Sequence, residues 1–236
     1  DKHNGLLTDT AVIEWIPEGK VKKKEPLGNG NPPGSLRIQL DNLSEPPASQ
    51  EPTVALLLAL PRPLQLGRML PMISQMGVSH LVLSQARKVP KDYFGSHLFR
   101  KPEQLRERLI EGLCQAGDVR LPDLHIVKNL QWFLEDDLDV MFPLDKYSRV
   151  IAHPQRLSDD IGSLRRMRDV VFPEGTGSSP RRLLLAVGPE GGWEEPDELD
   201  RFQKHKFQQI TLGSRVLRSD CAVVSLLALA HDACID

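Results

Sequence analysis

Two loops near the end of the sequence contain residue types that could bind a ligand. The first covers residues 188–192, reads Gly-Pro-Glu-Gly-Gly and follows the apolar run 183–187. Its glycines let the backbone turn sharply and approach a ligand closely. The second covers residues 212–218, reads Leu-Gly-Ser-Arg-Val-Leu-Arg and is followed by Ser219 and Asp220. The first loop matches neither GxGxxG nor GxxxxGK(S/T), so it indicates no standard phosphate-binding loop.

Each of these features also has an ordinary structural explanation. Strand-to-helix turns often contain several glycines, and most arginines are simply exposed to solvent. His153 follows the apolar run 150–152, and a single histidine after a strand is more often structural than catalytic. The two loops and the histidine together in one chain are a stronger signal than any of them alone.

The elements that must position these residues form a regular pattern from Thr53 onward. Short apolar segments predict strands at 54–60, 80–84, 124–127, 150–152, 183–187 and 209–212. Further segments predict helices near 64–76, 102–116, 129–136, 194–205 and 220–232. This alternation predicts an α/β fold whose mostly parallel sheet is covered by helices on both faces. Ligands bind such sheets outside the carboxyl ends of the strands, where the 188–192 loop falls.

The first 50 residues differ from the rest of the chain. Strand signals cover residues 5–16 and 36–40, and residues 42–52 are rich in Pro, Ser and Glu and read as a linker. Two or three strands cannot close a core alone. We therefore expect a partial β segment and linker over residues 1–50 and the main domain over residues 51–236.

Composition argues against several classes of protein. The 236 residues include 30 Lys and Arg and 32 Asp and Glu, which gives a net charge of -2. The chain therefore has no overall positive charge that would attract nucleic acid. Cys114, Cys221 and Cys234 lack a CxxC spacing and no HExxH occurs, which argues against a disulfide framework and a metal site. The apolar runs 54–60 and 221–230 are too short to span a bilayer. We also expect no secretory leader, because no charged-then-apolar pattern follows Asp1.

The two loops resemble those of the SPOUT superfamily of S-adenosylmethionine-dependent RNA methyltransferases. Within it, the chain is most similar to the RsmE family, which methylates N3 of a uridine in small-subunit ribosomal RNA. The hallmark of that family is an apolar strand entering Gly-Pro-Glu-Gly-Gly, followed by Leu-Gly-x-Arg-x-Leu-Arg, as at 188–192 and 212–218. Softer similarities lie at Met76-Gly77-Val78 and at 111–122, so the resemblance covers about residues 53–234.

The resemblance implies a fold that periodicity does not predict. This is a SPOUT-type sheet with a C-terminal trefoil knot, preceded by a small partial PUA-like β segment. The loops would wrap S-adenosylmethionine in a bent conformation, and the residues implied to bind it are His153, Val187, Gly188, Glu190, Gly191, Gly192, Leu212, Gly213 and Leu217. The resemblance also implies small-subunit ribosomal RNA as a partner, a homodimer, no metal, no membrane, and a cytoplasmic protein or an organellar one in a eukaryote.

Methyl transfer to a uridine ring nitrogen requires that this nitrogen lose its proton. That nitrogen is protonated at neutral pH, so an enzyme must stabilise the uridine anion or supply a base. We expect Arg218 to be catalytic, because the several N–H donors of its planar guanidinium group can stabilise an anion or hold a phosphate. Asp220 is the second expected catalytic residue, and it could either orient Arg218 or take the proton.

One departure from the family pattern keeps alternatives open. Residues 219–222 read Ser-Asp-Cys-Ala, where the family usually has Thr-Glu-Thr-Ala. The chain could therefore be a SPOUT enzyme acting on another base or on a ribose, or a catalytically silent relative that binds RNA or supports ribosome assembly. A weaker alternative makes Cys221 a reactive thiol at a helix N-terminus.

RNA contacts would need local positive charge, since the chain as a whole is slightly acidic. Lone basic clusters are more often solvated faces than binding patches. The clusters in this sequence are Lys20 with Lys22, Lys23 and Lys24, then Arg165 with Arg166 and Arg168, and Arg181 with Arg182.

Overall fold

The chain divides into two compact units, Asp1–Ser49 and Gln50–Asp236. The computed structural model describes residues 10–17, 34–41, 44, 51–154, 165–174 and 180–235. In the first unit, β1 (Thr10–Pro17) pairs antiparallel with β2 (Gly34–Asp41), so both predicted N-terminal strands are present. The predicted residues 5–9 and the basic cluster at 20–24 lie outside the described residues. The PUA-like identity of this unit stays a prediction.

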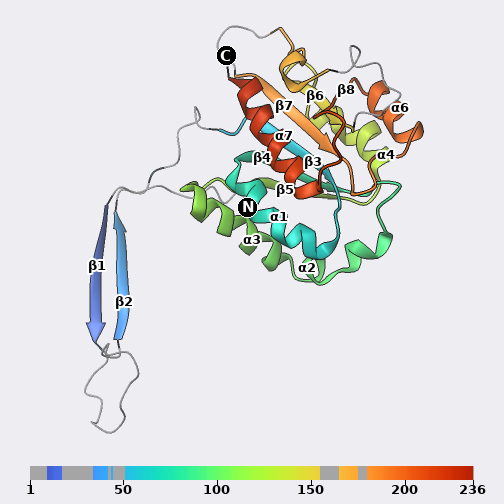
Figure 1. Cartoon of the computed structure of the whole chain (residues 1–236). Coiled ribbons are helices and arrows are strands. Elements are labelled where there is room, and N and C mark those ends of the chain that lie inside the picture. The colour runs from blue at the N-terminus through green and yellow to red at the C-terminus, as the bar shows by residue number, and fades with distance from the viewer. Residues whose placement is uncertain are drawn as a thin grey trace. The chain divides into compact units, whose positions relative to one another are not determined.

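The second unit is built on a six-stranded parallel sheet in the order β5-β4-β3-β7-β6-β8 (Figure 1). Its central strands are buried along nearly their whole length, which explains why their sequences are continuous apolar runs. The strands are β3 (Val54–Ala59), β4 (Val78–Ser84), β5 (Asp123–Val127), β6 (Tyr147–Ala152), β7 (Arg182–Val187) and β8 (Gln208–Ile210).

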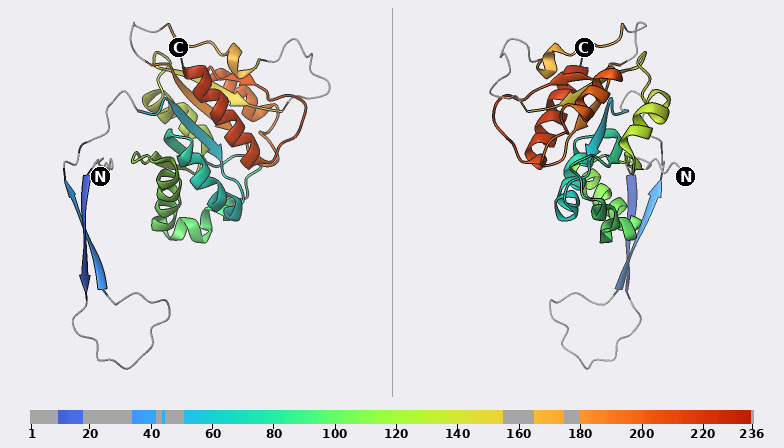
Figure 2. Two further views of the ribbon diagram at one scale, coloured as in Figure 1. Left: turned by 60° about the vertical axis from the view of Figure 1, so that its left-hand side comes forward. Right: turned by 90° about the vertical axis from the view of Figure 1, so that its right-hand side faces the viewer.

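Helices cover both faces of this sheet, as the sequence predicts. On one face, α7 (Ser219–Cys234) lies along the strands, contacts β3, β7 and α1 (Pro63–Gln75), and α1 packs against α3 (Pro102–Ala116) (Figure 2). The other face carries α5 (Leu138–Met141) and α6 (Asp197–Lys204). There, the buried Arg149 of β6 donates hydrogen bonds to the carbonyl oxygens of Phe142 and His205, just beyond the ends of these two helices. The α/β fold is therefore confirmed, while the trefoil knot stays a prediction.

Several predicted boundaries shift in the structure. The predicted helix at 129–136 is a chain of short pieces, α4 (Leu130–Trp132), the π-helical turn η3 (Phe133–Asp137) and α5. The predicted strand at 209–212 ends at Ile210, because the Thr211 hydroxyl accepts a hydrogen bond from the Gly213 N–H and turns the chain. The sequence reading also missed η2 (Lys91–Gly95), α2 (His97–Arg100) and η4 (Met167–Asp169), which are too short to show a helical period.

The predicted helix at 194–205 begins only at Asp197 in the structure. The carboxylate of Glu198 accepts hydrogen bonds from the backbone N–H groups of Glu194, at 2.6 Å, and Arg87, at 2.7 Å. This buried carboxylate holds the preceding residues as a turn rather than a helix. Residues 194–196, which the sequence places in the helix, therefore continue the 188–192 loop instead.

No helix in the part of the chain that the structure describes is long and apolar enough to cross a bilayer.

Candidate active site

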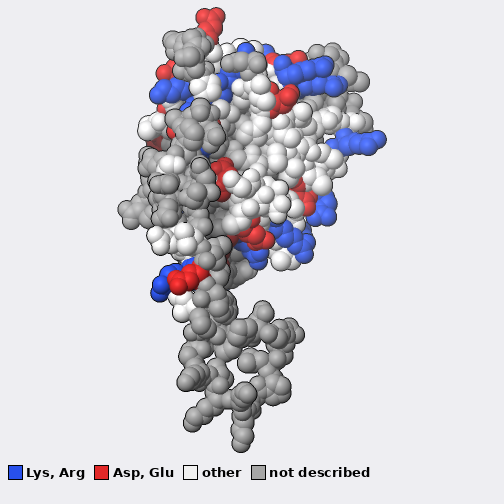
Figure 3. Space-filling model, turned by 90° about the vertical axis from the view of Figure 1, so that its left-hand side faces the viewer, with Lys and Arg blue, Asp and Glu red and all other residues white. Residues whose placement is uncertain are grey.

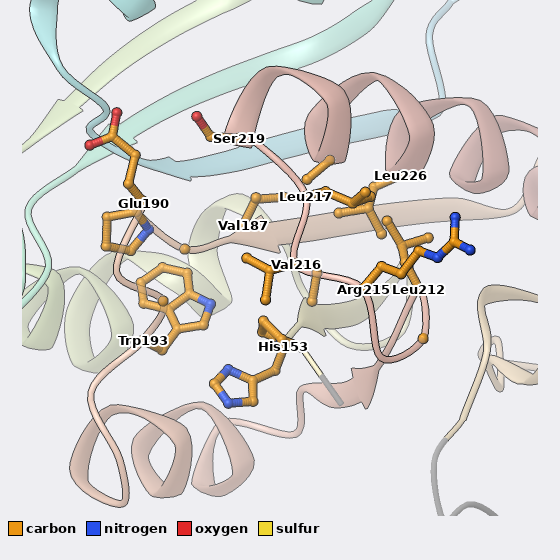
Figure 4. Close-up of a pocket in the computed structure, with 17 residues that line it drawn as sticks. His153, Val187, Glu190, Trp193, Leu212, Arg215, Val216, Leu217, Ser219 and Leu226 are labelled. Atoms are coloured by element: carbon orange, nitrogen blue, oxygen red, sulfur yellow. The ribbon is translucent and has the colours of Figure 1, made fainter. Parts of the chain in front are cut away.

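A pocket forms where the segments leaving β6, β7 and β8 meet, outside the carboxyl ends of the strands (Figure 4). The space between its walls, counted out to open solvent, is about 690 Å³. The residues that line it are Ala152, His153, Pro154, Val187, Gly188, Pro189, Glu190, Gly192, Trp193, Leu212, Gly213, Arg215, Val216, Leu217, Ser219, Ala222 and Leu226.

The structure brings nearly all of the expected cofactor-binding residues to this pocket. Gly191 is the exception, since it does not line the pocket and a Cβ there would lie 3.3 Å from Cδ of Lys88. The two expected catalytic residues, Arg218 and Asp220, also lie outside the lining, but they alternate along the chain with Leu217 and Ser219, which belong to it. They therefore flank the pocket rather than form its wall.

Gly188 is the glycine that the pocket geometry requires. A Cβ at this position would lie 3.2 Å from both the backbone nitrogen and Nε1 of Trp193, and 3.3 Å from its Cδ1. Such distances are tighter than ordinary van der Waals contact, so a side chain here would push against the indole ring. The absence of a side chain at Gly188 lets the loop backbone lie directly over Trp193.

Lys88 fixes the far side of the 188–192 loop. Its Nζ donates hydrogen bonds to the carbonyl oxygens of Gly191 and Trp193, each at 3.1 Å, and lies 3.8 Å from a carboxylate oxygen of Glu194. Lys88 follows β4, so this contact ties the loop, which follows β7, to a segment from a strand two places away in the sheet. The loop is thus held in shape before any ligand enters.

His153 connects two walls of the pocket. Its backbone N–H donates to the carbonyl oxygen of Ile210, which joins the end of β6 to the end of β8. Its side chain is buried, and Nε2 lies 2.8 Å from Oε1 of Glu195. This pairing fixes the imidazole ring against the segment that follows the glycine loop.

Arg218 and Asp220 form an ion pair at the edge of the pocket. Nη2 of Arg218 lies 2.8 Å from Oδ2 of Asp220, whose other oxygen accepts a hydrogen bond from the Cys221 N–H at 2.9 Å. Burial acts to raise the pKa of Asp220, but the hydrogen bonds from Cys221 and the Gln65 side chain and the charge of Arg218 outweigh it, so this pKa lies below its ordinary value. Asp220 is therefore ionised and a weak base.

The predicted basic clusters differ in their place relative to this pocket. Arg165 bridges to Ile210 beside β8, and its carbonyl oxygen accepts a hydrogen bond from the Thr211 N–H, next to the pocket-lining Leu212. Arg181 and Arg182 lie away from the pocket. Arg182 forms an ion pair with Glu51 at 3.2 Å, and the Arg181 guanidinium lies 5.4 Å from the ring centre of Phe172. Both arginines lie at the amino end of β7, the opposite edge of the sheet from the pocket. On the face that Figure 3 shows, the described positive and negative side chains are interspersed. Other positive residues near the pocket are Arg62, Lys88, Arg215 and Arg218.

Several residues that line or support the pocket were not predicted as site residues, among them Trp193, Glu195 and Lys88, and Arg215 and Val216 of the second loop. Trp193 and Glu195 directly follow the glycine loop, so their nearness to the motif was the available signal. Lys88 lies about a hundred positions earlier in the chain, and no local pattern marks it. Within the described residues, no group of His, Cys, Asp and Glu side chains could hold a metal ion.

Comparison with known proteins identifies the family. The model of the RNA methyltransferase domain family matches residues 49–231. The chain belongs to this family. The resemblance of its two loops to the RsmE-like SPOUT proteins is thereby confirmed.

Two curated relatives carry the same name, ribosomal RNA small subunit methyltransferase E. The protein from Treponema pallidum is 30% identical over 182 residues, which cover 75% of this chain and 62% of that protein. The protein from Mesomycoplasma hyopneumoniae is 43% identical over 49 residues, which cover 21% of each. This chain therefore spans less than two thirds of the length of either relative.

A solved structure shares the fold. The ribosomal RNA small subunit methyltransferase E of Neisseria gonorrhoeae, which was determined bound to S-adenosyl methionine, superposes with a TM-score of 0.60 and 20% identity. The match covers 84% of this chain and 73% of the other. It supports the SPOUT-type arrangement of the second unit.

Proposed function

We propose that this protein transfers a methyl group from S-adenosylmethionine to N3 of a uridine in small-subunit ribosomal RNA. The observation that carries the proposal is the pocket at the ends of β6, β7 and β8, built from both motif loops of an RNA methyltransferase family. The names of the two curated relatives support the choice of ribosomal RNA.

The residues of the pocket fit this cofactor. Val187, Leu212 and Leu217 offer apolar surface for the faces of an adenine ring. Glu190 and Arg215 also line the pocket, and their opposite charges suit the ammonium and carboxylate groups of the methionine part. The buried indole N–H of Trp193 has no hydrogen-bond partner in the described structure, which leaves a donor for a ligand.

The bound cofactor supplies an electrophilic methyl group on a sulfonium sulfur. The glycine loop, held by Lys88, shapes a wall that excludes water from one side of the reaction. Arg218 stabilises the uridine anion by its charge, which lowers the cost of losing the N3 proton to solvent water at the open side of the pocket. Asp220 orients the Arg218 guanidinium, because a carboxylate with a lowered pKa holds a cation better than it accepts a proton.

A homodimer is the second part of the proposal. Apolar side chains at the rim of the pocket are open to solvent, with Val216 84% and Leu217 41% exposed. Leu229, on the outer side of α7, is 42% exposed. A partner subunit would cover these side chains and close the pocket. Light scattering at micromolar concentration should give twice the chain mass, and a monomer would contradict the proposal.

The test of the activity uses purified full chain and small-subunit RNA from cells that lack their own uridine N3 mark. Calorimetric titration should show binding of S-adenosylmethionine, and nucleoside mass spectrometry of the treated RNA should show 3-methyluridine. A different methylated nucleoside would identify an enzyme of another specificity. RNA binding without any methyl transfer would identify a catalytically silent relative.

A further inference from the structure

The indole N–H of Trp193 is a buried donor with no use in the described structure. Trp193 is 1% exposed, and Nε1 has no hydrogen-bond partner among the described residues. An indole nitrogen can only donate a hydrogen bond, so it needs an acceptor as its partner. A buried donor without a partner costs free energy, and in native structures this requires an explanation such as a ligand.

The ring that carries this donor is fixed in place. The indole packs edge-to-face on Phe202, with ring centres 4.7 Å apart, and Phe202 packs in turn on Phe207 at 4.9 Å. On the other side, the backbone of Gly188 lies so close that a Cβ there would be 3.2 Å from Nε1. A ring confined in this way cannot turn its N–H toward another partner, so the donor is preorganised.

The residue that carries this donor lines the pocket. Trp193 lines the pocket together with Val187, His153 and Val216, and Figure 4 shows the indole nitrogen on the side of the ring that faces Val216. The charged residues of the lining are Glu190 and Arg215, which suit the charged methionine end of the cofactor. A neutral donor among mostly apolar side chains matches a neutral acceptor, such as a ring nitrogen of adenine.

We propose that Trp193 Nε1 donates a hydrogen bond to the adenosine half of the cofactor and so selects for it. This inference rests on the proposed function, since it takes S-adenosylmethionine as the ligand of the pocket. Losing one neutral hydrogen bond typically weakens binding by about three- to tenfold. The loss should appear in affinity for any ligand that contains the adenosine part.

The experiment replaces the N–H without changing the shape of the ring. In a parent carrying Trp15→Phe and Trp132→Phe, Trp193 is the remaining tryptophan of the chain, and a benzothiophene analogue of tryptophan can be incorporated there. Trp193→Phe is the second variant. Trp132→Phe alone is the matched control, because Trp132 is 66% exposed and lies outside the pocket lining.

Binding is measured by calorimetry with two probes, S-adenosylhomocysteine and 5′-methylthioadenosine, which lacks the amino acid end. We expect the benzothiophene protein to bind both about three- to tenfold more weakly than its parent. Without ligand it should melt no earlier, because the lost N–H had no partner. Unchanged affinity for both probes would overturn the proposal, and a loss confined to S-adenosylhomocysteine would overturn the assignment to the adenosine half.

Failure of the proposed function would look different. If the parent protein bound neither S-adenosylmethionine nor S-adenosylhomocysteine, the cofactor assignment itself would fall, together with the role of Trp193. If the parent bound both and the variants bound equally well, the proposed function would stand and the role of Trp193 alone would be wrong.

Discussion

At the scale of single residues, Gly188 and Gly191 of the 188–192 loop have different neighbours. A Cβ on Gly188 would press on Trp193, whose backbone and ring are both fixed. A Cβ on Gly191 would lie 3.3 Å from Cδ of Lys88, whose side chain is partly exposed and needs to shift by only a few tenths of an ångström. The sequence alone gives the two glycines equal weight, whereas the structure makes Gly188 the constrained one.

We therefore expect Gly188→Ala to weaken ligand binding in the pocket and Gly191→Ala to leave it nearly unchanged. Overpacking a rigid contact typically costs about 1–3 kcal/mol. Displacement of Trp193 should weaken S-adenosylmethionine binding by about tenfold or more, as measured by calorimetric titration. Equal affinities for the two variants would show that the Gly188 contact does not shape the site.

Arg218 allows a separate test of catalysis, because it flanks the pocket without lining it. Arg218→Ala should keep cofactor affinity but lose on the order of a hundred- to a thousand-fold in the rate of methyl transfer, as expected for a group that acts in the transition state. Single-turnover methyl transfer at saturating RNA measures this rate. Arg218→Lys should recover little, since an ammonium cannot reproduce the planar fork.

A melting curve beside the rate measurement guards against a structural explanation. If Arg218→Ala melts earlier and loses cofactor and activity together, Arg218 stabilises the start of α7 instead. A variant as active as the parent would remove Arg218 from the mechanism.

At the scale of elements, α1 and α3 pack with their backbones close together. Ser74 of α1 donates a hydrogen bond through Oγ to the carbonyl oxygen of Leu109 at 2.7 Å. One turn further along α3, a Cβ on Gly112 would lie only 2.0 Å from the carbonyl oxygen of Pro71 and 2.2 Å from Ser74 Oγ. Gly112 therefore permits the two backbones to touch.

We expect Gly112→Ala to destabilise the protein by about 1–3 kcal/mol or more, although alanine is the better helix former. Gly67→Ala in α1 is the matched control, because the nearest atom to its Cβ would be Leu98 Cδ1 at an ordinary 3.8 Å. That variant should gain roughly 0.5–1 kcal/mol. Urea unfolding measures both, and a stable Gly112→Ala variant would show that α1 and α3 can separate without cost.

At the scale of the whole molecule, partly buried histidines link stability to pH. Burial lowers the pKa of His80, and the nearby Asp123 offsets only part of this effect. Burial also lowers the pKa of His231, with a smaller opposing effect from a hydrogen bond with the Met76 backbone. In the unfolded chain both histidines bind protons more readily, so acid favours unfolding.

The stability of the protein should therefore fall as the pH drops through the ordinary histidine pKa, near 6.5. Urea unfolding at about pH 7.5 and about pH 5.5 measures the difference. A variant carrying His80→Gln and His231→Gln should lose less stability than the parent over this interval. An equal loss in both proteins would assign the acid sensitivity to other groups.

The sequence by itself determined the architecture and the place of the site. Continuous apolar runs at β3 and β7 identify strands buried on both faces, and the alternation with helices predicts the parallel sheet. The two motif loops are each continuous in sequence, so their residues could be named before the structure. These features depend on local order along the chain, which a sequence records directly.

Only the tertiary structure decided which residues of the site act together. The Lys88 contact with the glycine loop joins residues more than a hundred positions apart, and the fit of Gly188 over Trp193 depends on the rotation of one ring. The pairing of His153 with Glu195 likewise requires the segment before α6 to remain a turn. Such contacts depend on distances of a few ångströms between packed elements, because hydrogen bonds and van der Waals contacts act only over that range.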